Sequence, residues 1–290
     1  MGILAGLVAA LAWTLASSLW RGLATSLNAI QLNGLKNAIA CAALLPVLIT
    51  LPWAGEVNNL MLLLISGGMG ISLGDSFYLA ALRRLGTRRT LTLESLAPVA
   101  AAAGGWLAMG ERLSPQGWTG ALLVTISVVL VALQQPPDAT RIPDRSRAVQ
   151  VQGLLLALFA VVCGVAGAAV SRTVLISSEL TPLQSAACRL LGGLLLLLPW
   201  LRFRAGFPQP RPRRTRWPRV LAATLMGTVL GILLQQVVLQ RLPLGIGITV
   251  LSTAPVMALL VAPAEGDHLK PSVLLASALA VTGVGLAVLS

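Results

Sequence analysis

Residues 69–99 read MGISLGDSFYLAALRRLGTRRTLTLESLAPV, and residues 226–256 read MGTVLGILLQQVVLQRLPLGIGITVLSTAPV. The two stretches align without a gap at a shift of 157 positions, and 12 of the 31 aligned residues are identical. Roughly three identities are expected by chance for so biased a composition. A shift of 153 positions likewise pairs Lys36 with Arg189. The sequence therefore contains an internal duplication.

The whole chain is too apolar for a soluble domain. Of its 290 residues, 56% are hydrophobic and 10% are charged, whereas soluble proteins carry about 25% charged residues. The apolar residues form long uncharged blocks of about 20 residues, the length that a helix needs to cross the hydrocarbon core. No alternating apolar and polar pattern is present, so helices must satisfy the backbone hydrogen bonds in lipid. We predict an all-α integral membrane protein.

Ten transmembrane helices are expected, separated by proline, glycine or charged residues. The expected spans are 2–21, 33–52, 60–82, 90–109, 116–134, 151–176, 183–201, 219–240, 244–263 and 271–289. A polar linker at 136–150 divides the chain into a first five-helix repeat, 1–135, and a second, 151–290. Because each repeat has an odd number of spans, the second enters the membrane in the opposite direction. Two such inverted repeats are typical of secondary transporters.

The net charge of +12 indicates membrane topology rather than nucleic-acid binding, because the basic residues cluster between the apolar blocks. Arg112, Arg172, Arg189 and Arg241 fall on the side reached after even-numbered spans, and the other 17 of the 21 Lys and Arg residues fall on the opposite side. The positive-inside rule places the more basic side in the cytoplasm. Both termini are therefore expected outside the plasma (inner) membrane.

Two carboxylates are predicted within the membrane. Asp75 lies in the third span and Glu94 in the fourth, and their repeat equivalents are the apolar Ile232 and Leu251. A charge at the bilayer centre costs about 2.5–3.5 kcal/mol, so such residues usually face a cavity or a partner. The functional interpretation is a proton or cation relay, or a contact with the solute. The structural alternatives are an ion pair with a basic side chain, for which the candidates are Arg21, Lys36 and Arg189, and a carboxylate near a helix end that extends to the membrane interface.

Pro98 and Pro255 lie inside the fourth and ninth expected spans. A proline in a helix removes one backbone donor, so a carbonyl of the preceding turn loses its partner. Ser95 and Ser252 lie one turn earlier and give both spans a polar, kinked segment. Interrupted helices at matching positions indicate a transporter binding site, whereas a kink that serves packing alone is the structural alternative.

Gly70 and Gly74 are four residues apart, and Gly227 and Gly231 repeat the pattern at the equivalent place. Small residues at this spacing allow helix backbones to approach closely, so we expect helix packing here. Gln235 and Gln236 are expected to bond a solute or one another across helices. The aromatic candidates for a cavity wall are Trp13, Trp20, Phe77, Tyr78 and Trp106.

Motifs for other chemistry are missing from the sequence. It contains no phosphate-binding G-x-x-x-x-G-K-[ST] segment and no H-E-x-x-H motif. The three cysteines lie inside apolar blocks without metal-ligand spacing. We therefore expect neither an enzyme nor a cofactor or metal site.

The chain resembles the EamA-type transporters of the drug/metabolite transporter superfamily. The resembling segments are GDSFYLAAL at 74–82, LAPV at 96–99 and MGERL at 109–113, and both halves carry Ala-Pro-Val in their fourth helix. Lys36 and Arg189 match the basic residue that is usual in the second helix of each repeat. The second half departs from the Gly-Glu-x-Leu pattern with AEGDHL at 264–269, so the role of Glu111 is not duplicated.

The resemblance implies a ten-helix secondary carrier that exports metabolites, amino acids or drug-like compounds, by proton coupling or exchange. Its partners would be a small-molecule solute, protons or a counter-solute, and membrane lipids; a homodimer is compatible with this interpretation. Family members generally have cytoplasmic termini, whereas the arginines here predict the reverse. One alternative is a non-transporting membrane protein that binds a lipid or protein partner, with a sealed Asp75–Arg21 type of ion pair and no polar cavity. The other is a membrane enzyme, which needs a nucleophile or metal set.

Overall fold

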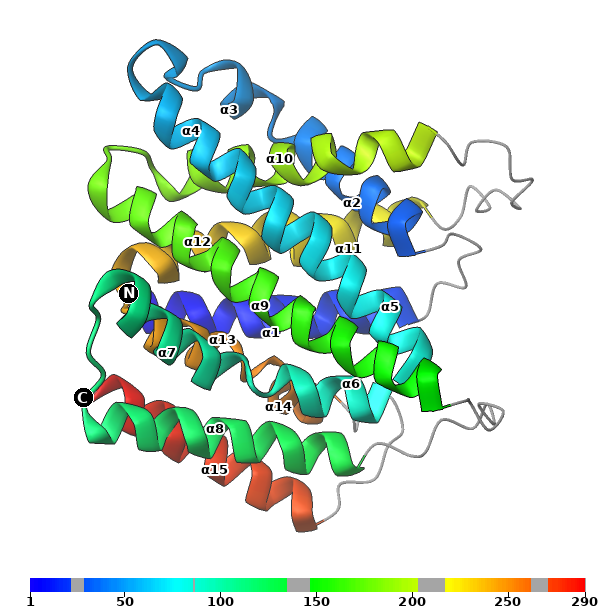
Figure 1. Ribbon diagram of the computed structural model, residues 1–290, viewed down its shortest axis with the longest axis vertical. Helices are drawn as coiled ribbons and strands as arrows, with labels where there is room; N and C mark the ends of the chain where they lie inside the picture. The colour runs from blue at the N-terminus through cyan, green and yellow to red at the C-terminus, as the bar shows by residue number, and fades with distance from the viewer. Residues whose placement is uncertain (22–28, 86, 135–146, 203–216, 262–270, 290) are drawn as a thin grey trace.

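The computed structural model describes residues 1–21, 29–85, 87–134, 147–202, 217–261 and 271–289. All regular secondary structure in these ranges is helical. Most helices run between two opposite ends of one bundle, and both chain termini lie at the same end (Figure 1). We call the end that holds the start of α1 and the end of α15 the terminal end.

The first part of the chain begins with a 20-residue helix and continues with shorter helical pieces. Its elements are α1 (Gly2–Arg21), α2 (Ala29–Ala43), α3 (Leu45–Ile49), α4 (Trp53–Gly67), the π-helix η1 (Gly68–Gly74), α5 (Asp75–Leu85), α6 (Thr87–Glu94), α7 (Ala97–Met109) and α8 (Pro115–Gln134). The expected span at 33–52 is divided between α2 and α3, because Pro46 in the first turn of α3 has no N–H to continue a helix.

The second part repeats this order with a longer first helix. Its elements are α9 (Arg147–Ser177), α10 (Pro182–Arg202), α11 (Trp217–Ala223), the π-helix η3 (Thr224–Leu230), α12 (Gly231–Arg241), α13 (Leu244–Leu251), α14 (Ala254–Val261) and α15 (Pro271–Val288). Pro115, Pro182 and Pro271 each occupy the first position of a helix, where a missing N–H costs nothing.

The two π-helices fall at nearly equivalent places in the duplicated sequence. A shift of 157 carries η1 onto residues 225–231, one residue from the observed η3. A π turn disturbs the regular ladder of helical hydrogen bonds, and such turns occur often at functional sites. Side chains of neighbouring helices bond to this part of the chain: the Asn33 amide donates to the Ile71 carbonyl at 2.9 Å.

The two parts of the chain are interleaved rather than separate. Helix α1 packs against η3 and α12, whereas α9 packs against η1 and α5. These contacts are close: a Cβ on Gly231 would lie 2.2 Å from Trp13 Nε1, and a Cβ on Gly167 would lie 3.0 Å from the Gly70 nitrogen. The glycines therefore lie at contacts between helices of the two parts. At one edge of the bundle, α8 and α15 pack side by side (Figure 1).

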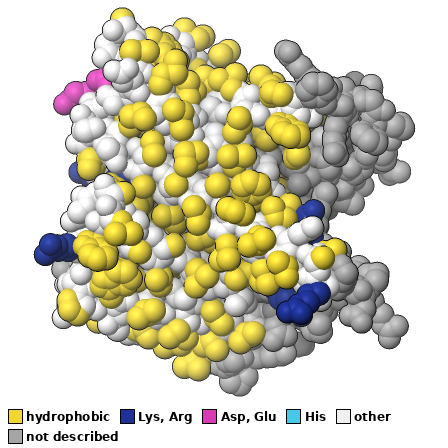
Figure 2. Space-filling view, viewed as in Figure 1, with side chains coloured by type: hydrophobic (Ala, Val, Ile, Leu, Met, Phe, Trp, Pro, Cys, Tyr) yellow, Lys and Arg dark blue, Asp and Glu magenta, His cyan; other side chains and the backbone are white. Residues whose placement is uncertain are grey.

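The outer surface is apolar. Figure 2 shows hydrophobic side chains across the middle of one face, with charged side chains near the two ends of the helices. Large side chains such as Leu107 and Val281 are 76% and 74% exposed, as expected for contact with lipid. Within the described ranges, seven helices are long and apolar enough to cross a membrane. They are Gly2–Trp20, Trp53–Leu82, Arg89–Met109, Pro115–Leu133, Arg147–Ser177, Pro182–Leu201 and Trp217–Arg241, with shorter apolar helices at Leu244–Met257 and Leu275–Val288.

Candidate functional site

A cavity of about 700 Å³ lies between the two parts of the chain. Its wall includes residues of α1, α2, α5, α6, α9, α10, α12 and α13, so each part contributes about half of the elements. The sequence-predicted residues that line the cavity are Trp13, Trp20, Lys36, Asp75, Tyr78, Glu94, Ser95, Arg189, Gln235 and Ser252, together with Gly70, Gly74, Gly227 and Pro255. Residues far apart in the sequence thus meet around one polar space.

Asp75 begins α5, immediately after the π-helix η1. Its Oδ2 atom lies 3.7 Å from Lys36 Nζ on α2. The Asp75 side chain nevertheless keeps 46% of its surface accessible, and the Lys36 side chain 23%, because both line the cavity. The pair is therefore exposed to the cavity rather than sealed. The side chain of Arg21, another expected partner of this carboxylate, lies outside the described residues.

Arg189 is the second cation of the cavity wall. It is only 2% exposed, its charge acts on Asp75, and its Nη1 donates to Gln235 Oε1 at 3.2 Å. The neighbouring Gln236 does not line the cavity. Its Oε1 atom accepts hydrogen bonds from Ser171 and, at 2.9 Å, from Ser185, so it joins α12 to α9 and α10.

Glu94 is the last residue of α6 and lies in the cavity wall. Among the described residues, no Lys or Arg nitrogen lies within 4 Å of its carboxylate. Asp75 and Glu94 thus differ: one carboxylate has a cationic partner, and the other has none in the described ranges. A carboxylate without a partner in such a site is the better candidate for reversible proton or cation binding.

The helix breaks directly after Glu94. Pro98 in the first turn of α7 has no N–H to donate to the Glu94 carbonyl. The Ser95 hydroxyl turns back to the Thr92 carbonyl at 2.7 Å, and Thr125 of α8 donates to the Ser95 carbonyl at 2.9 Å. The break is thus held in place by a neighbouring helix.

The second part of the chain breaks at the equivalent position. Helix α13 ends at Leu251 and α14 begins at Ala254, with Pro255 in its first turn. The Thr14 hydroxyl of α1 donates to the Ala254 carbonyl at 2.8 Å. Two interrupted helices therefore meet the cavity from opposite parts of the chain.

Several site residues were not predicted from the sequence. Thr14, Asn37 and Thr228 also line the cavity, as does Trp20 of the aromatic candidates, whereas Phe77 and Trp106 do not. Phe77 instead packs on the Phe159 ring, and Trp106 is 54% exposed. Asn37 could have been suggested by its position in the sequence directly after Lys36, which was already a candidate. Within the described ranges, no three His, Cys, Asp or Glu side chains come together as metal ligands would.

These features define a multi-pass helical membrane protein that encloses a charged cavity between its two parts. The sequence profile described as the EamA-like transporter family matches residues 1–133 and 151–289. The chain belongs to this family and, with it, to the drug/metabolite transporter superfamily. A solved protein crystal structure is similar in fold, with a TM-score of 0.77 and 21% identity over 99% of this chain and 96% of its own. A comparison with curated proteins gave no match.

Proposed function

We propose that the protein is a secondary active transporter that moves a small metabolite, amino acid or drug-like compound through the central cavity. The observation that carries this proposal is the charged lining of that cavity, with Asp75, Glu94, Lys36 and Arg189 around one space. Charged groups in the interior of a membrane protein are costly and usually mark a solute or ion path. The family membership supports a transporter in general terms.

The proposed architecture is ten crossings in two inverted five-helix repeats, 1–135 and 151–290, joined by the linker 136–150. The matching π-helices and the matching helix breaks support it. The reciprocal packing of α1 on η3 and of α9 on η1 supports it as well, because a pseudo-two-fold axis would exchange these two contacts. An even number of crossings also agrees with both termini at one end of the bundle (Figure 1).

The proposed orientation places the terminal end outside the plasma membrane. It is supported by the distribution of Lys and Arg along the sequence. The proposed direction of transport is export, which rests on the general behaviour of the family. Protons or a counter-solute would drive the cycle, and Glu94 would be the coupling residue.

The alternative is a membrane protein that binds a lipid or protein partner without transport. Such a protein would have no polar cavity, and Asp75 would form an ion pair that is closed off from solvent. A cavity of about 700 Å³ and an accessible Asp75 carboxylate favour transport instead.

Quenching of tryptophan fluorescence tests whether the cavity takes up a solute. Purified protein is titrated with amino acids, sugars and cationic drugs in turn. The proposal expects one class to give a saturable signal, because Trp13 and Trp20 line the cavity. The double variant Trp13→Phe/Trp20→Phe should lose most of this signal, whereas the control Trp106→Phe, on the outer surface, should keep it. A signal that survives in the double variant and vanishes in the control would place binding outside the cavity.

A further inference from the structure

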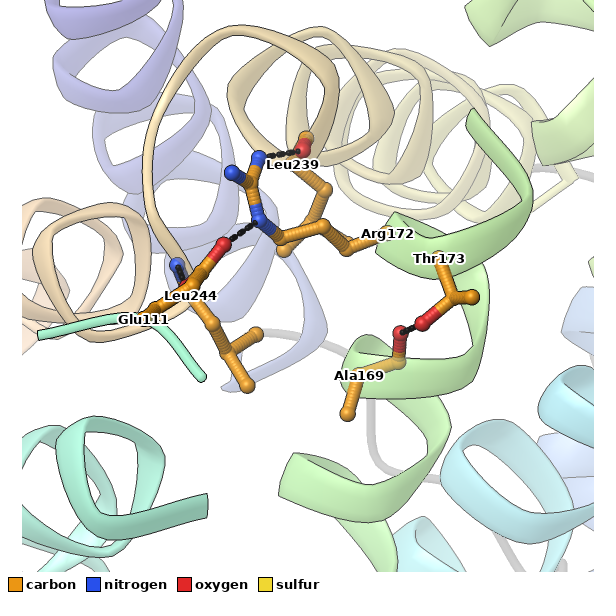
Figure 3. Close-up of polar contacts among 6 residues, drawn as sticks. All are labelled: Glu111, Ala169, Arg172, Thr173, Leu239 and Leu244. Atoms are coloured by element: carbon orange, nitrogen blue, oxygen red, sulfur yellow. Dashed lines mark hydrogen bonds and ion pairs between the residues drawn. The ribbon is translucent and has the colours of Figure 1, made fainter. Parts of the chain in front are cut away.

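A second charged cluster joins the two parts of the chain away from the cavity. Glu111, in the loop between α7 and α8, forms an ion pair with Arg172 Nε of α9. Its other carboxylate oxygen accepts the backbone N–H of Leu244 at 2.7 Å, and Arg172 Nη1 donates to the Leu239 carbonyl at 2.6 Å. Figure 3 shows the carboxylate and the guanidinium pointing toward one another beside these two backbone groups.

The loop geometry fixes Glu111 in this position. Gly110 ends α7 in the left-handed region, with φ of 67°, a conformation that glycine adopts without strain. The backbone N–H of Glu111 then bonds to the Gly105 carbonyl at 3.1 Å. The carboxylate packs against the same residue, since a Cβ on Gly105 would lie 3.0 Å from Glu111 Oε2.

The pair supplies partners that the turn between α12 and α13 lacks. The Leu239 carbonyl would normally accept from the residue four positions later, but that residue is Pro243, which has no N–H. Leu244 is the first residue of α13, so its N–H has no partner within the helix. Arg172 donates a hydrogen bond to the Leu239 carbonyl, and Glu111 accepts one from the Leu244 N–H. The turn is therefore tied to α9 and to the α7–α8 loop at once.

An apolar layer lies between this cluster and the cavity. It is formed by Ala9, Ala101, Ala168, Leu239, Leu244 and Ile248. Ile248 belongs to both the layer and the cavity wall, and Trp13 packs on the layer from the cavity side. Leu239 and Leu244 are also the residues whose backbone the ion pair holds. The order from the centre outward is therefore cavity, apolar layer and ion pair.

The apolar layer and the ion pair lie near the terminal end. A Cβ on Gly2 would lie 3.0 Å from Arg241 Cβ, so the start of the chain is next to the α12–α13 turn. The side chains of Arg172 and Glu111 are 11% and 15% exposed, so the pair is largely shielded. A solute that leaves the cavity at this end has to pass the layer, and the ion pair connects α9, the start of α13 and the α7–α8 loop beside that layer.

We propose that the Glu111–Arg172 pair is the gate of the terminal end, which separates when the cavity opens on that side. The proposal rests on the proposed transport function and names its moving contact. Loss of either side chain removes one connection between the first and the second part of the chain. The equilibrium should then shift toward conformations that are open at the terminal end.

Cysteine accessibility tests the gate without any solute. Gly164 lines the cavity, and a Cβ added there meets no atom within 4 Å, so Gly164→Cys is a well-tolerated reporter. Cys41, Cys163 and Cys188 are free thiols and are first replaced by alanine. The membrane-impermeant reagent 2-sulfonatoethyl methanethiosulfonate is applied from the terminal side of reconstituted vesicles, and that side is identified by a tag after the last residue.

Glu111→Gln and Arg172→Gln should each raise the labelling rate from the terminal side about tenfold, which corresponds to about 1.4 kcal/mol. The milder Arg172→Lys should give an intermediate rate, because lysine keeps the charge but cannot serve both partners. Glu56→Gln is the matched control. It removes a carboxylate at the same end that accepts a hydrogen bond from Asn59 at 2.6 Å and is not part of the ion pair, and it should leave the rate unchanged.

Unchanged labelling in a folded Glu111→Gln or Arg172→Lys protein would overturn the gate. Folding is checked by labelling from the opposite side, which should not rise. If Glu111→Gln fails to fold, Arg172→Lys decides the question. The result for the gate can be distinguished from the result for transport. Faster labelling in a protein that moves no solute would support the gate and refute transport. Transport with unchanged labelling would support transport and refute the gate.

Discussion

Neutralising Asp75 should destabilise the protein, whereas neutralising Glu94 should leave its stability nearly unchanged and abolish proton-coupled transport. Asp75 lies 3.7 Å from Lys36. A pair at this distance is worth about 4 kcal/mol at an effective dielectric constant of 20 and about 1 kcal/mol in bulk water. Because the Asp75 side chain is 46% accessible, the interaction lies in the lower part of that range. Asp75→Asn leaves Lys36 and Arg189 uncompensated, and it should destabilise the protein by about 1–3 kcal/mol.

Glu94→Gln removes a charge that has no cationic partner in the described ranges. It should change the free energy of unfolding by less than about 1 kcal/mol, because no cation among the described residues loses a partner. Gln keeps the shape and one acceptor, so solute binding should persist. Uptake driven by a pH gradient should fall to the level of protein-free liposomes, because the amide cannot carry a proton.

The assay combines two measurements on the same preparations. The thermal midpoint in detergent compares wild type, Glu94→Gln and Asp75→Asn. Uptake into proteoliposomes, with the solute selected by the quenching screen, compares wild type and Glu94→Gln. Wild-type uptake and pH profile in a folded Glu94→Gln protein would refute the coupling role and move it to Asp75. A Glu94→Gln protein that misfolds would instead show that the carboxylate has a structural partner.

Three further perturbations test the surrounding structure. Gly67→Ala should destabilise the protein by about 1–3 kcal/mol, because the new Cβ would lie 1.9 Å from the Arg189 carbonyl oxygen. The control Gly55→Ala, in the same helix, meets nothing within 4 Å and should be neutral. Equal thermal midpoints of the two variants would argue against the close contact of α4 with α10. Thr125→Val should cost about 0.5–1.5 kcal/mol through the lost bond to the Ser95 carbonyl, and a pulse-proteolysis measurement that finds no loss would mean that the helix break needs no support from α8. Cysteines introduced at 177–182 should react from outside intact cells and cysteines at 211–219 should not. Residues 211–216 lie outside the described residues, and labelling of this second segment from outside would reverse the proposed orientation.

The duplicated stretch predicted more of the fold than the hydropathy did. It located the two helix breaks, since a proline near a helix start removes a donor wherever the chain runs. Hydropathy predicted ten spans, whereas seven helices in the part of the chain that the structure describes meet the length and composition needed for crossing. The expected span at 33–52 is divided at Leu44 between α2 and α3. The expected spans at 244–263 and 271–289 include positions whose side chains lie outside the described residues, and their described parts are the shorter apolar helices Leu244–Met257 and Leu275–Val288. The π-helices were not predicted, because no residue pattern separates a π turn from an α-helix.

The sequence predicted which charged and polar residues form the candidate site, but not which of them contact one another. The cost of charge in lipid singled out Asp75 and Glu94 without showing which one has a partner. Gln235 and Gln236 are adjacent in the sequence, but consecutive residues point about 100° apart on a helix, and the face that lines the cavity depends on tertiary packing. Glu111 drew attention only through the resemblance, because Arg172 lies 61 positions away and no local signal joins them.

Uptake by the purified protein in the absence of ATP is the direct test of secondary active transport. Proteoliposomes are loaded at one pH, diluted into another, and supplied with the radiolabelled solute from the quenching screen. Parallel vesicles are preloaded with unlabelled solute. The account predicts accumulation that depends on the pH gradient and collapses with a protonophore, or uptake that preloading accelerates. A folded protein that binds the solute but moves none of it under either condition would contradict the account and leave a binding protein in its place.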